Sequence, residues 1–372
     1  MSPLLQFPRV HFDYGAVDAL ADELAALGIT RPLFITDQGL VRCGVFAQAR
    51  RALPAGNDVA LFDAVPENPT IAGVERAIAI YHAKGCDGVV AVGGGSVIDT
   101  AKAVAVLAGH SGPITDYLGR PERITAAVAP LVAIPTTAGT GSEASRGAGI
   151  HADTTTRATG LNSHHIVPKV ALCDPELTLS LPPALTAGTG MDALSHCIEG
   201  FLTVTVNPPA DAIALDGIER VFAFIERAVR DGSDREARWN LMMGGLKGGM
   251  SIHMGLGPAH AITNTCGDRG LHHGTLVTLA LPAVLRLLAS HVPDKMARLA
   301  HAMALAPGTS PADAIEAMNA RLGLPASLRA MGYGDADLDE MAEDAARSHF
   351  NTRSPHRPSR AEFRAMLDQI AG

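Results

Sequence analysis

Asp192 and His196 have the residue types and the spacing that a metal site requires. They lie four residues apart in the segment 190–200, whose apolar pattern predicts a helix. Four residues are about one helical turn, so both side chains lie on one face and lean the same way. A carboxylate and an imidazole so placed can bind one divalent metal ion. They can equally form a simple side-chain hydrogen bond, so a metal site requires further ligands.

Two histidines farther along the chain supply candidate ligands. His260 follows the Gly-rich segment 255–259, and His273 stands thirteen residues later. Together with Asp192 and His196 they make one carboxylate and three imidazoles, a set that suits Fe²⁺ and also Zn²⁺. This set leaves net positive charge on the metal, which can then act as a Lewis acid on an alcohol or carbonyl oxygen. Because each histidine alone could have a purely structural role, the metal-site hypothesis requires all four side chains to meet.

A glycine-rich turn indicates a second kind of site, one for phosphate. Gly93, Gly94, Gly95 and Ser96 come between a strand predicted at 88–92 and a predicted helix. Glycines there let the backbone approach a ligand closely, and the N–H groups of the helix point at it, which suits a pyrophosphate. A tight turn without a ligand is the alternative. The turn is not the Gly-x-Gly-x-x-Gly fingerprint, so the predicted domain is only Rossmann-like.

Polar residues after two other predicted strands extend this site. Asp37 ends the strand predicted at 31–36 and could accept hydrogen bonds from an adenosine ribose. It would repel a 2′-phosphate, which favours NAD over NADP; a capping or turn role is the alternative. The segment 136–142, after the strand predicted at 131–134, offers four hydroxyls for phosphate, ribose or amide groups. It would also suit the N-cap of a helix beginning at Ser142.

Two kinds of periodicity divide the chain near residue 180. Before that point, short apolar runs alternate with helical patterns such as 70–84, which implies βαβ units and a largely parallel sheet. After it, helical periodicity takes over, as in 310–323. We therefore expect an α/β dinucleotide-binding domain at 1–180 and an all-helical, metal-binding catalytic domain at 181–372. The basic segment 349–360 is expected to be a loop before the last helix.

The composition argues against several classes of partner. The chain has 372 residues, a net charge of −8 and a pI near 6.0, which recommend neither nucleic acid nor an anionic membrane. Its five cysteines are scattered and odd in number, which favours a reducing compartment over a disulfide scaffold. No signal peptide or membrane-spanning run is recognisable. We expect a cytoplasmic protein that acts on a small molecule.

The motifs in combination resemble those of the iron-containing alcohol dehydrogenase family, over nearly the whole chain and in the right order. The matching motifs are Gly93-Gly94-Gly95-Ser96-x-x-Asp99-x-x-Lys102, the segments 135–143, 174–178 and 190–199, Gly257-x-x-His260-Ala261, His273-Gly274 and Asn351-x-Arg353.

The resemblance implies a two-domain, dehydroquinate-synthase-like fold and a metal-dependent, NAD(P)-dependent oxidoreductase. The reaction would interconvert a small alcohol and its aldehyde, or a hydroxy acid and its semialdehyde, in a homo-oligomer for which a dimer is favoured. The resemblance implies that the metal, Fe²⁺ with Zn²⁺ as the alternative, is held by Asp192, His196, His260 and His273. It assigns the dinucleotide to Asp37, Asn68, Gly93, Gly94, Gly95, Ser96, Asp99, Thr136, Thr137 and Thr140.

Two positions depart from the family pattern. Asn264 stands where members commonly carry a second histidine, and an amide can contact substrate or ribose but cannot act as a base. His272 or a ribose-linked water chain would then carry the proton. Ala158, beside Arg157, stands where a lysine is common, so a nicotinamide-ribose contact is lost or rebuilt.

Two other functions are alternatives. One is a lyase of the dehydroquinate synthase kind, which also uses NAD and a metal. It would need a basic cluster for a substrate phosphate, and the helical half shows no convincing one. The other is a non-catalytic NAD-binding homologue, which the change at Asn264 motivates and the four candidate ligands oppose.

Overall fold

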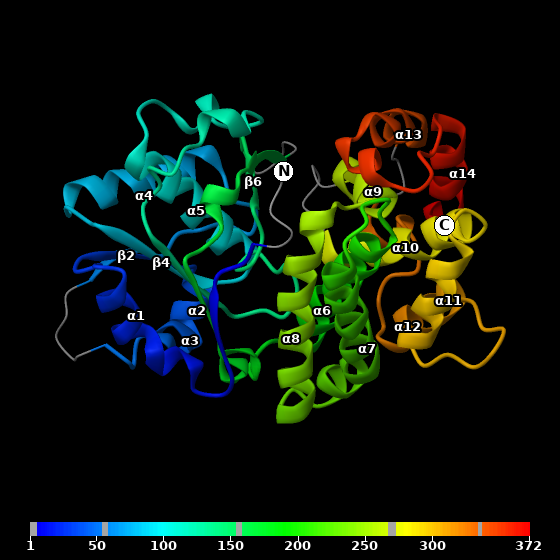
Figure 1. Ribbon diagram of the computed structural model, residues 1–372, viewed down its shortest axis with the longest axis horizontal. Helices are drawn as coiled ribbons and strands as arrows, with labels where there is room; N and C mark the ends of the chain where they lie inside the picture. The colour runs from blue at the N-terminus through cyan, green and yellow to red at the C-terminus, as the bar shows by residue number, and fades with distance from the viewer. Residues whose placement is uncertain (1–5, 54–58, 154–157, 267–272, 334–336) are drawn as a thin grey trace. The chain divides into compact units, whose positions relative to one another are not determined.

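A computed structural model of the chain describes residues 6–53, 59–153, 158–266, 273–333 and 337–372 (Figure 1). By its internal contacts the chain divides into two compact units. We call them the α/β unit, residues 6–137 and 141–180, and the helical unit, residues 138–140 and 181–372. Arg157 and His272 lie outside the described residues.

The α/β unit is built on a six-stranded sheet whose neighbouring strands are all parallel. The strand order is β1-β8-β5-β4-β2-β3, and β6 and β7 form a separate antiparallel hairpin. The strands are β1 (Arg9–Phe12), β2 (Pro32–Ile35), β3 (Ala60–Phe62), β4 (Gly88–Gly93), β5 (Leu131–Pro135), β6 (Gly147–His151), β7 (Ala158–Asn162) and β8 (Val170–Cys173). The α-helices are α1 (Leu20–Ala26), α2 (Gln38–Arg42), α3 (Val45–Ala49), α4 (Ile71–Ala83) and α5 (Gly95–Gly109).

Alternate residues of the central strands face opposite sides of this sheet. In β2, Leu33 and Ile35 belong to the core cluster that contains residues of α4 and α5, whereas Phe34 packs in the cluster with α1 and α3. Figure 1 shows these two pairs of helices on opposite faces. Because both faces are covered, the strands β2, β4, β5 and β8 are apolar and buried throughout, as is usual for parallel sheets.

The elements predicted for this unit are confirmed where the sequence pattern was strong. The helix predicted at 70–84 is α4; Thr70 caps its start by accepting a hydrogen bond from Gly73 N, and Gly85 follows its end at φ 60°. The strands predicted at 31–36, 88–92 and 131–134 correspond to β2, β4 and β5. The alternative in which a helix begins at Ser142 is wrong, because residues 142–144 form a turn.

In the helical unit, the described residues from 181 onward form only helices, turns and loops. Residues 186–202 of α6 are all buried, and α6 packs against α7, α8 and α10. The α-helices are α6 (Pro183–Leu202), α7 (Pro208–Arg230), α8 (Arg235–Ser251), α9 (Pro258–Cys266), α10 (His273–Leu288), α11 (Pro293–Ala302), α12 (Pro311–Arg321), α13 (Leu338–Arg347) and α14 (Arg360–Ala371).

The segment 349–360 is more ordered than the expected loop. It opens with a 3-10 helix, His349–Arg353, and only the residues after it form a loop before α14. Ser359 and Glu362 form a reciprocal capping box that fixes the start of α14. Within the described parts of the chain, no helix combines the length and apolar character that crossing a membrane requires.

Candidate metal centre and dinucleotide site

Helix α6 carries Asp192 and His196 on one face, as the four-residue spacing predicts, and both side chains are buried. Asp192 is 2% exposed and His196 is 5% exposed. The Asp192 Oδ1 atom lies 3.6 Å from Nε2 of His196, which is too long for a hydrogen bond. The simple alternative, a side-chain hydrogen bond within the helix, is therefore not what the structure shows.

The other two histidines converge on the same carboxylate oxygen. His260, near the start of α9, and His273, the first residue of α10, each have Nε2 3.9 Å from Oδ1 of Asp192. The ligand atoms of Asp192, His260 and His273 lie within 4.8 Å of one another, which marks them as a possible metal site. His196 joins this group from the side, with its ring stacked 4.9 Å from the ring of His260. The structure thus brings all four predicted residues together.

A close contact between two helices brings His273 to this place. A Cβ atom on Gly274 would lie 2.3 Å from the carbonyl oxygen of Gly188 in α6 and 3.2 Å from Cβ of Asp192. Only a glycine lets the backbone of α10 approach α6 so closely. The pair His273-Gly274 therefore delivers an imidazole to the carboxylate of α6.

Three buried atoms of the cluster have no hydrogen-bond partner: Nδ1 of His196, Oδ1 of Asp192 and Nε2 of His260. The last two face each other across 3.9 Å. A buried polar atom without a partner costs about 1–3 kcal/mol, so its presence calls for an explanation. A cation bound between Asp192 and His260 would satisfy these two atoms. One carboxylate with three imidazoles therefore fits Fe²⁺ or Zn²⁺.

Glu199 orients His260 for this role, which the sequence alone did not predict. Its carboxylate accepts hydrogen bonds from Nδ1 of His260 at 2.6 Å, from Gly257 N at 2.9 Å and from Ala259 N at 2.8 Å. With the proton held on Nδ1, the lone pair of Nε2 faces Asp192. Such carboxylate–histidine pairs fix the tautomer of metal-binding imidazoles. The signals in the sequence were that Glu199 ends the motif at 190–199 and that it stands three residues after His196.

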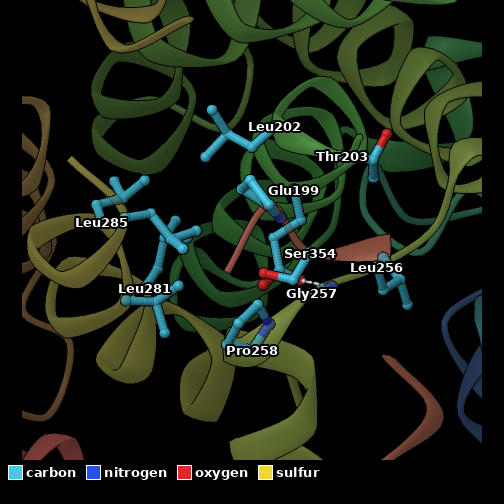
Figure 2. Close-up of a pocket in the computed structure, with 12 residues that line it drawn as sticks. Glu199, Leu202, Thr203, Leu256, Gly257, Pro258, Leu281, Leu285 and Ser354 are labelled. Atoms are coloured by element: carbon cyan, nitrogen blue, oxygen red, sulfur yellow. Dashed lines mark hydrogen bonds between the residues drawn. The ribbon is translucent and has the colours of Figure 1, made fainter. Parts of the chain in front are cut away.

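Glu199 also lines a mainly apolar pocket. Figure 2 shows Glu199 among the lining side chains, with a dashed line for its hydrogen bond with Gly257. The remaining walls are mainly leucine, valine and proline side chains, among them Leu202, Leu281 and Pro258. In such surroundings the hydrogen bond between Glu199 and His260 is stronger than it would be in water.

The two inner histidines differ in proton affinity. Burial, together with the neighbouring His260, lowers the pKa of His196 to about 3, so this imidazole is neutral and able to bind a metal. Burial also acts to lower the pKa of His260, but the hydrogen bond and charge of Glu199 raise it above the ordinary value. His273 differs from both, since its side chain is 48% exposed.

The predicted dinucleotide residues of the α/β unit follow three adjacent strands. Strand β4 lies between β5 and β2 and pairs in parallel with both. Asp37 follows β2, the glycine turn follows β4, and Thr136 and Thr137 follow β5. These residues therefore lie along the carboxyl edge of the sheet, which is where open α/β folds bind ligands.

The glycine turn is tightly packed against its neighbours. Strand β4 ends at Gly93 and α5 begins at Gly95, and a Cβ atom on Gly94 would lie 3.2 Å from the Thr137 side chain. The Ser96 hydroxyl donates a hydrogen bond to the carbonyl oxygen of Glu67, the residue before Asn68. The segment with Asn68 is thereby tied to the first turn of α5.

Three other predicted residues have more specific surroundings. Asp37 caps α2 by accepting a hydrogen bond from Leu40 N at 2.9 Å, so the capping alternative is observed. Asp99, in α5, accepts hydrogen bonds from Ser142 and from Gly149 N. Thr140 belongs to the helical unit, whereas Thr136 and Thr137 belong to the α/β unit.

Asn264 and Ala158, the two positions that depart from the family pattern, both lie within the described residues. Asn264 is exposed on α9, one turn after His260, so the two side chains share a face of that helix. Ala158 begins β7, opposite His151 in β6.

Comparison with known proteins places this geometry in a family. The model "Iron-containing alcohol dehydrogenase" matches residues 8–175, and "Fe-containing alcohol dehydrogenase family, C-terminal" matches residues 186–371. The 4-hydroxybutyrate dehydrogenase of Cupriavidus necator is 48% identical over 384 residues, covering 99% of this chain and 100% of that enzyme.

Solved structures agree over the whole length. The chain superimposes on 1,3-propanediol oxidoreductase with a TM-score of 0.92 and 31% identity, covering 98% of this chain and 99% of that one. It superimposes on sulfoacetaldehyde reductase from Bifidobacterium kashiwanohense, solved in complex with NAD⁺, with a TM-score of 0.91 and 26% identity, covering 100% and 99% of the two chains.

The expected fold, activity class and cofactors are confirmed by these matches, and neither the lyase nor the non-catalytic alternative is favoured by them. The chain belongs to the iron-containing alcohol dehydrogenase family, and it is an NAD- and metal-dependent oxidoreductase that acts on a small alcohol.

Proposed function

We propose that this enzyme interconverts a short-chain ω-hydroxy acid, such as 4-hydroxybutyrate, and its semialdehyde with NAD as the hydride carrier. The observation that carries this substrate class is 48% identity to 4-hydroxybutyrate dehydrogenase over the whole of both chains. Hydride would pass between the carbinol carbon of the substrate and C4 of the nicotinamide ring.

In this proposal Asp192, His196, His260 and His273 hold the metal ion, Fe²⁺ or else Zn²⁺. The buried, unpartnered atoms of Asp192 and His260 support this assignment. A divalent cation bound there supplies Lewis acidity toward the substrate oxygen. Glu199 keeps His260 in the required tautomer, and the burial of Asp192 and His260 excludes water from the inner side of the site.

The residues along the carboxyl edge of the sheet hold the dinucleotide in this proposal. The glycine turn and the N-terminus of α5 face the pyrophosphate, while Asp37, Asn68, Asp99, Thr136, Thr137 and Thr140 provide hydrogen bonds. One carboxylate oxygen of Asp37 caps α2, which leaves the other for a ribose hydroxyl. Its negative charge supports NAD over NADP.

Asn264 contacts the substrate or the ribose in this proposal. Its exposed position one turn after His260 supports that role. An amide can donate or accept a hydrogen bond but does not take up a proton at neutral pH, so it orients a partner without acting as a base.

The test is a substrate panel followed by nicotinamide absorbance, with the enzyme loaded separately with Fe²⁺ and Zn²⁺. We expect 4-hydroxybutyrate with NAD to give the highest kcat/KM, ahead of 1,3-propanediol and ethanol. Equal kcat/KM for ethanol and 4-hydroxybutyrate would overturn the hydroxy-acid assignment. A higher kcat/KM with NADP than with NAD would overturn the role of Asp37.

We further propose that residues 1–180 and 181–372 act as the dinucleotide-binding and metal-binding domains of a homodimer. The free edge of β1, which pairs only with β8 among the described strands, and the exposed Phe7 beside it support a contact between copies. Light scattering tests this contact: we expect the unmodified protein to be a dimer and Phe7→Ser to dissociate more readily. If the unmodified protein and the variant are both monomers, the contact is contradicted.

A cytoplasmic location is also proposed. Four of the five cysteines, Cys43, Cys86, Cys173 and Cys197, are free thiols, which supports a reducing compartment. Fractionation of the source cells tests this, and recovery outside the cytoplasm would contradict it.

A further inference from the structure

Lys102 is a fully buried cation in the middle of α5. Its side chain is 0% exposed, while its neighbours along the helix are mostly alanine and valine. Burying a charge is costly unless it is paired and hydrogen-bonded, and an apolar residue would fill the same space without that cost. The presence of a lysine therefore calls for a reason beyond packing.

The ammonium group is fully engaged by the turn that follows β5. It donates hydrogen bonds to Oγ of Ser142 at 2.8 Å and to the carbonyl oxygen of Gly147 at 2.6 Å. It also donates to Ser145, whose carbonyl oxygen and Oγ lie at 3.0 Å and 3.1 Å.

One of these partners passes the interaction on to Asp99. The Ser142 hydroxyl donates to Oδ1 of Asp99 at 2.6 Å, and Oδ2 of Asp99 accepts from Gly149 N at 2.8 Å. An ammonium group can only donate, so it occupies a lone pair of Ser142 and leaves the single hydroxyl proton for Asp99. The direction of the relay from Lys102 through Ser142 to Asp99 is thereby fixed.

Asp99 keeps capacity for another partner. Its side chain is 20% exposed, and each carboxylate oxygen has lone pairs beyond the one that its protein donor uses. Burial raises the pKa of Asp99, and the charge of Lys102, whose Nζ is 4.0 Å from Oδ1, is the largest influence that lowers it. Lys102 therefore favours the ionised carboxylate, which accepts hydrogen bonds only.

We propose that Lys102 is a positioning residue that acts through Ser142 to hold the Asp99 carboxylate as a hydrogen-bond acceptor for amide or hydroxyl donors of the dinucleotide. The inference rests on the proposed dinucleotide site and adds to it a residue that touches no ligand. A purely structural Lys102 would only tie α5 to the turn at residues 142–147.

The chain offers a matched pair of serines that separates these two roles. Ser142→Ala breaks the relay to Asp99 but leaves the other hydrogen bonds of Lys102 intact. Ser145→Ala removes one hydrogen bond of Lys102 without changing a partner of Asp99. Both variants are measured as metal-loaded enzyme for the Kd of NAD, the KM for NAD and kcat.

We expect Ser142→Ala to raise the Kd and KM for NAD about tenfold, as for loss of a hydrogen bond to a charged group, and Ser145→Ala to change them less than about twofold. Asp99→Asn is expected to weaken NAD binding as well. Because Ser142 acts through Asp99, adding Ser142→Ala to Asp99→Asn should cause no further loss. Metal content should stay unchanged in every variant.

Equal effects of Ser142→Ala and Ser145→Ala on the Kd of NAD would overturn the proposal, and so would full additivity of Ser142→Ala with Asp99→Asn. A Lys102→Met variant that folds and binds NAD as tightly as the unmodified enzyme would also overturn it. Failure of the unmodified, metal-loaded enzyme to bind NAD would instead refute the proposed dinucleotide site. The two failures are therefore distinguishable.

Discussion

The Nδ1 atom of His260 and the Oε2 atom of Glu199 lie 2.6 Å apart, and both side chains are only 2–3% exposed. The hydrogen bond keeps the proton on Nδ1, so Nε2 faces the carboxylate of Asp192 with its lone pair. We expect Glu199→Gln to weaken metal binding by about 10–100-fold, the usual effect of losing such a partner. Competition with a chelator measures this. Glu219→Gln, exposed on α7, is the control, and equal metal affinity in the two variants would contradict the role of Glu199.

Removing a ligand should separate metal binding from dinucleotide binding. We expect Asp192→Ala or His273→Ala to lose the metal, and kcat/KM to fall about a hundredfold or more. A bound metal stabilises the transition state by several kcal/mol, and each ~1.4 kcal/mol changes the rate tenfold. The Kd of NAD should change little. Elemental analysis and NAD titration measure both quantities, with His301→Ala, exposed on α11, as the control. Full turnover by a variant without metal would refute the site.

The glycine turn should tolerate no side chain at its first position. A Cβ atom on Gly93 would lie 2.5 Å from both Cβ and Cγ2 of Val97 in the first turn of α5. We expect Gly93→Ala to displace that turn, lower stability by about 1–3 kcal/mol and weaken NAD binding, with metal content unchanged. Thermal unfolding and NAD titration check this. Gly160→Ala, where the added Cβ meets nothing closer than 3.9 Å, should behave like the unmodified enzyme.

Asn264 should affect KM more than kcat. If its amide contacts the substrate, Asn264→Ala removes a binding interaction and should raise the KM for 4-hydroxybutyrate up to about tenfold. Asn264→Asp places a second negative charge near an anionic substrate and should raise KM further. Steady-state kinetics with 4-hydroxybutyrate and with uncharged 1,3-propanediol separate the two effects. Unchanged kinetics in both variants would show that Asn264 makes no such contact.

Glu143 should make stability depend on pH. Burial raises its pKa from 4.5 to about 7 in the folded chain, so the folded state binds more protons than the unfolded state between these values. Stability should therefore fall as pH rises from about 4.5 to about 7, by on the order of 3 kcal/mol. Glu143→Gln should abolish this part of the pH dependence, measured by denaturant unfolding at several pH values. Glu75→Gln, exposed on α4, should retain it.

Local sequence signals predicted the elements that carry the sites. The apolar stripe, cap and terminal glycine of the segment 70–84 gave α4 almost to the residue, and short apolar runs gave β2, β4 and β5. The hairpin of β6 and β7 was not predicted, because β6 contains two glycines in five residues and shows no clear alternation. The strand order was also beyond reach, since β1 pairs with β8, more than 150 residues away.

In the candidate metal site, too, local spacing was predictable and long-range packing was not. The four-residue spacing of Asp192 and His196 predicts a shared helix face, whereas the approach of His260 and His273 depends on tertiary packing such as the contact of Gly274 with Gly188. Lys102 could not be recognised as a buried cation, because nearly all of α5 is buried and a helical pattern alone does not show where its polar partners are. Glu199 was visible in a motif without an assigned partner.

The uneven exposure of the four proposed metal ligands has a consequence for how the ion would be exchanged. Asp192, His196 and His260 are enclosed by protein, while the side chain of His273 is 48% exposed at the start of α10. Among these four residues His273 is the one that solvent reaches most easily, so we expect metal exchange to begin at His273. The three enclosed residues would stay in place while His273 moves, so we expect the rate of metal release to follow the motion of the His273 side chain.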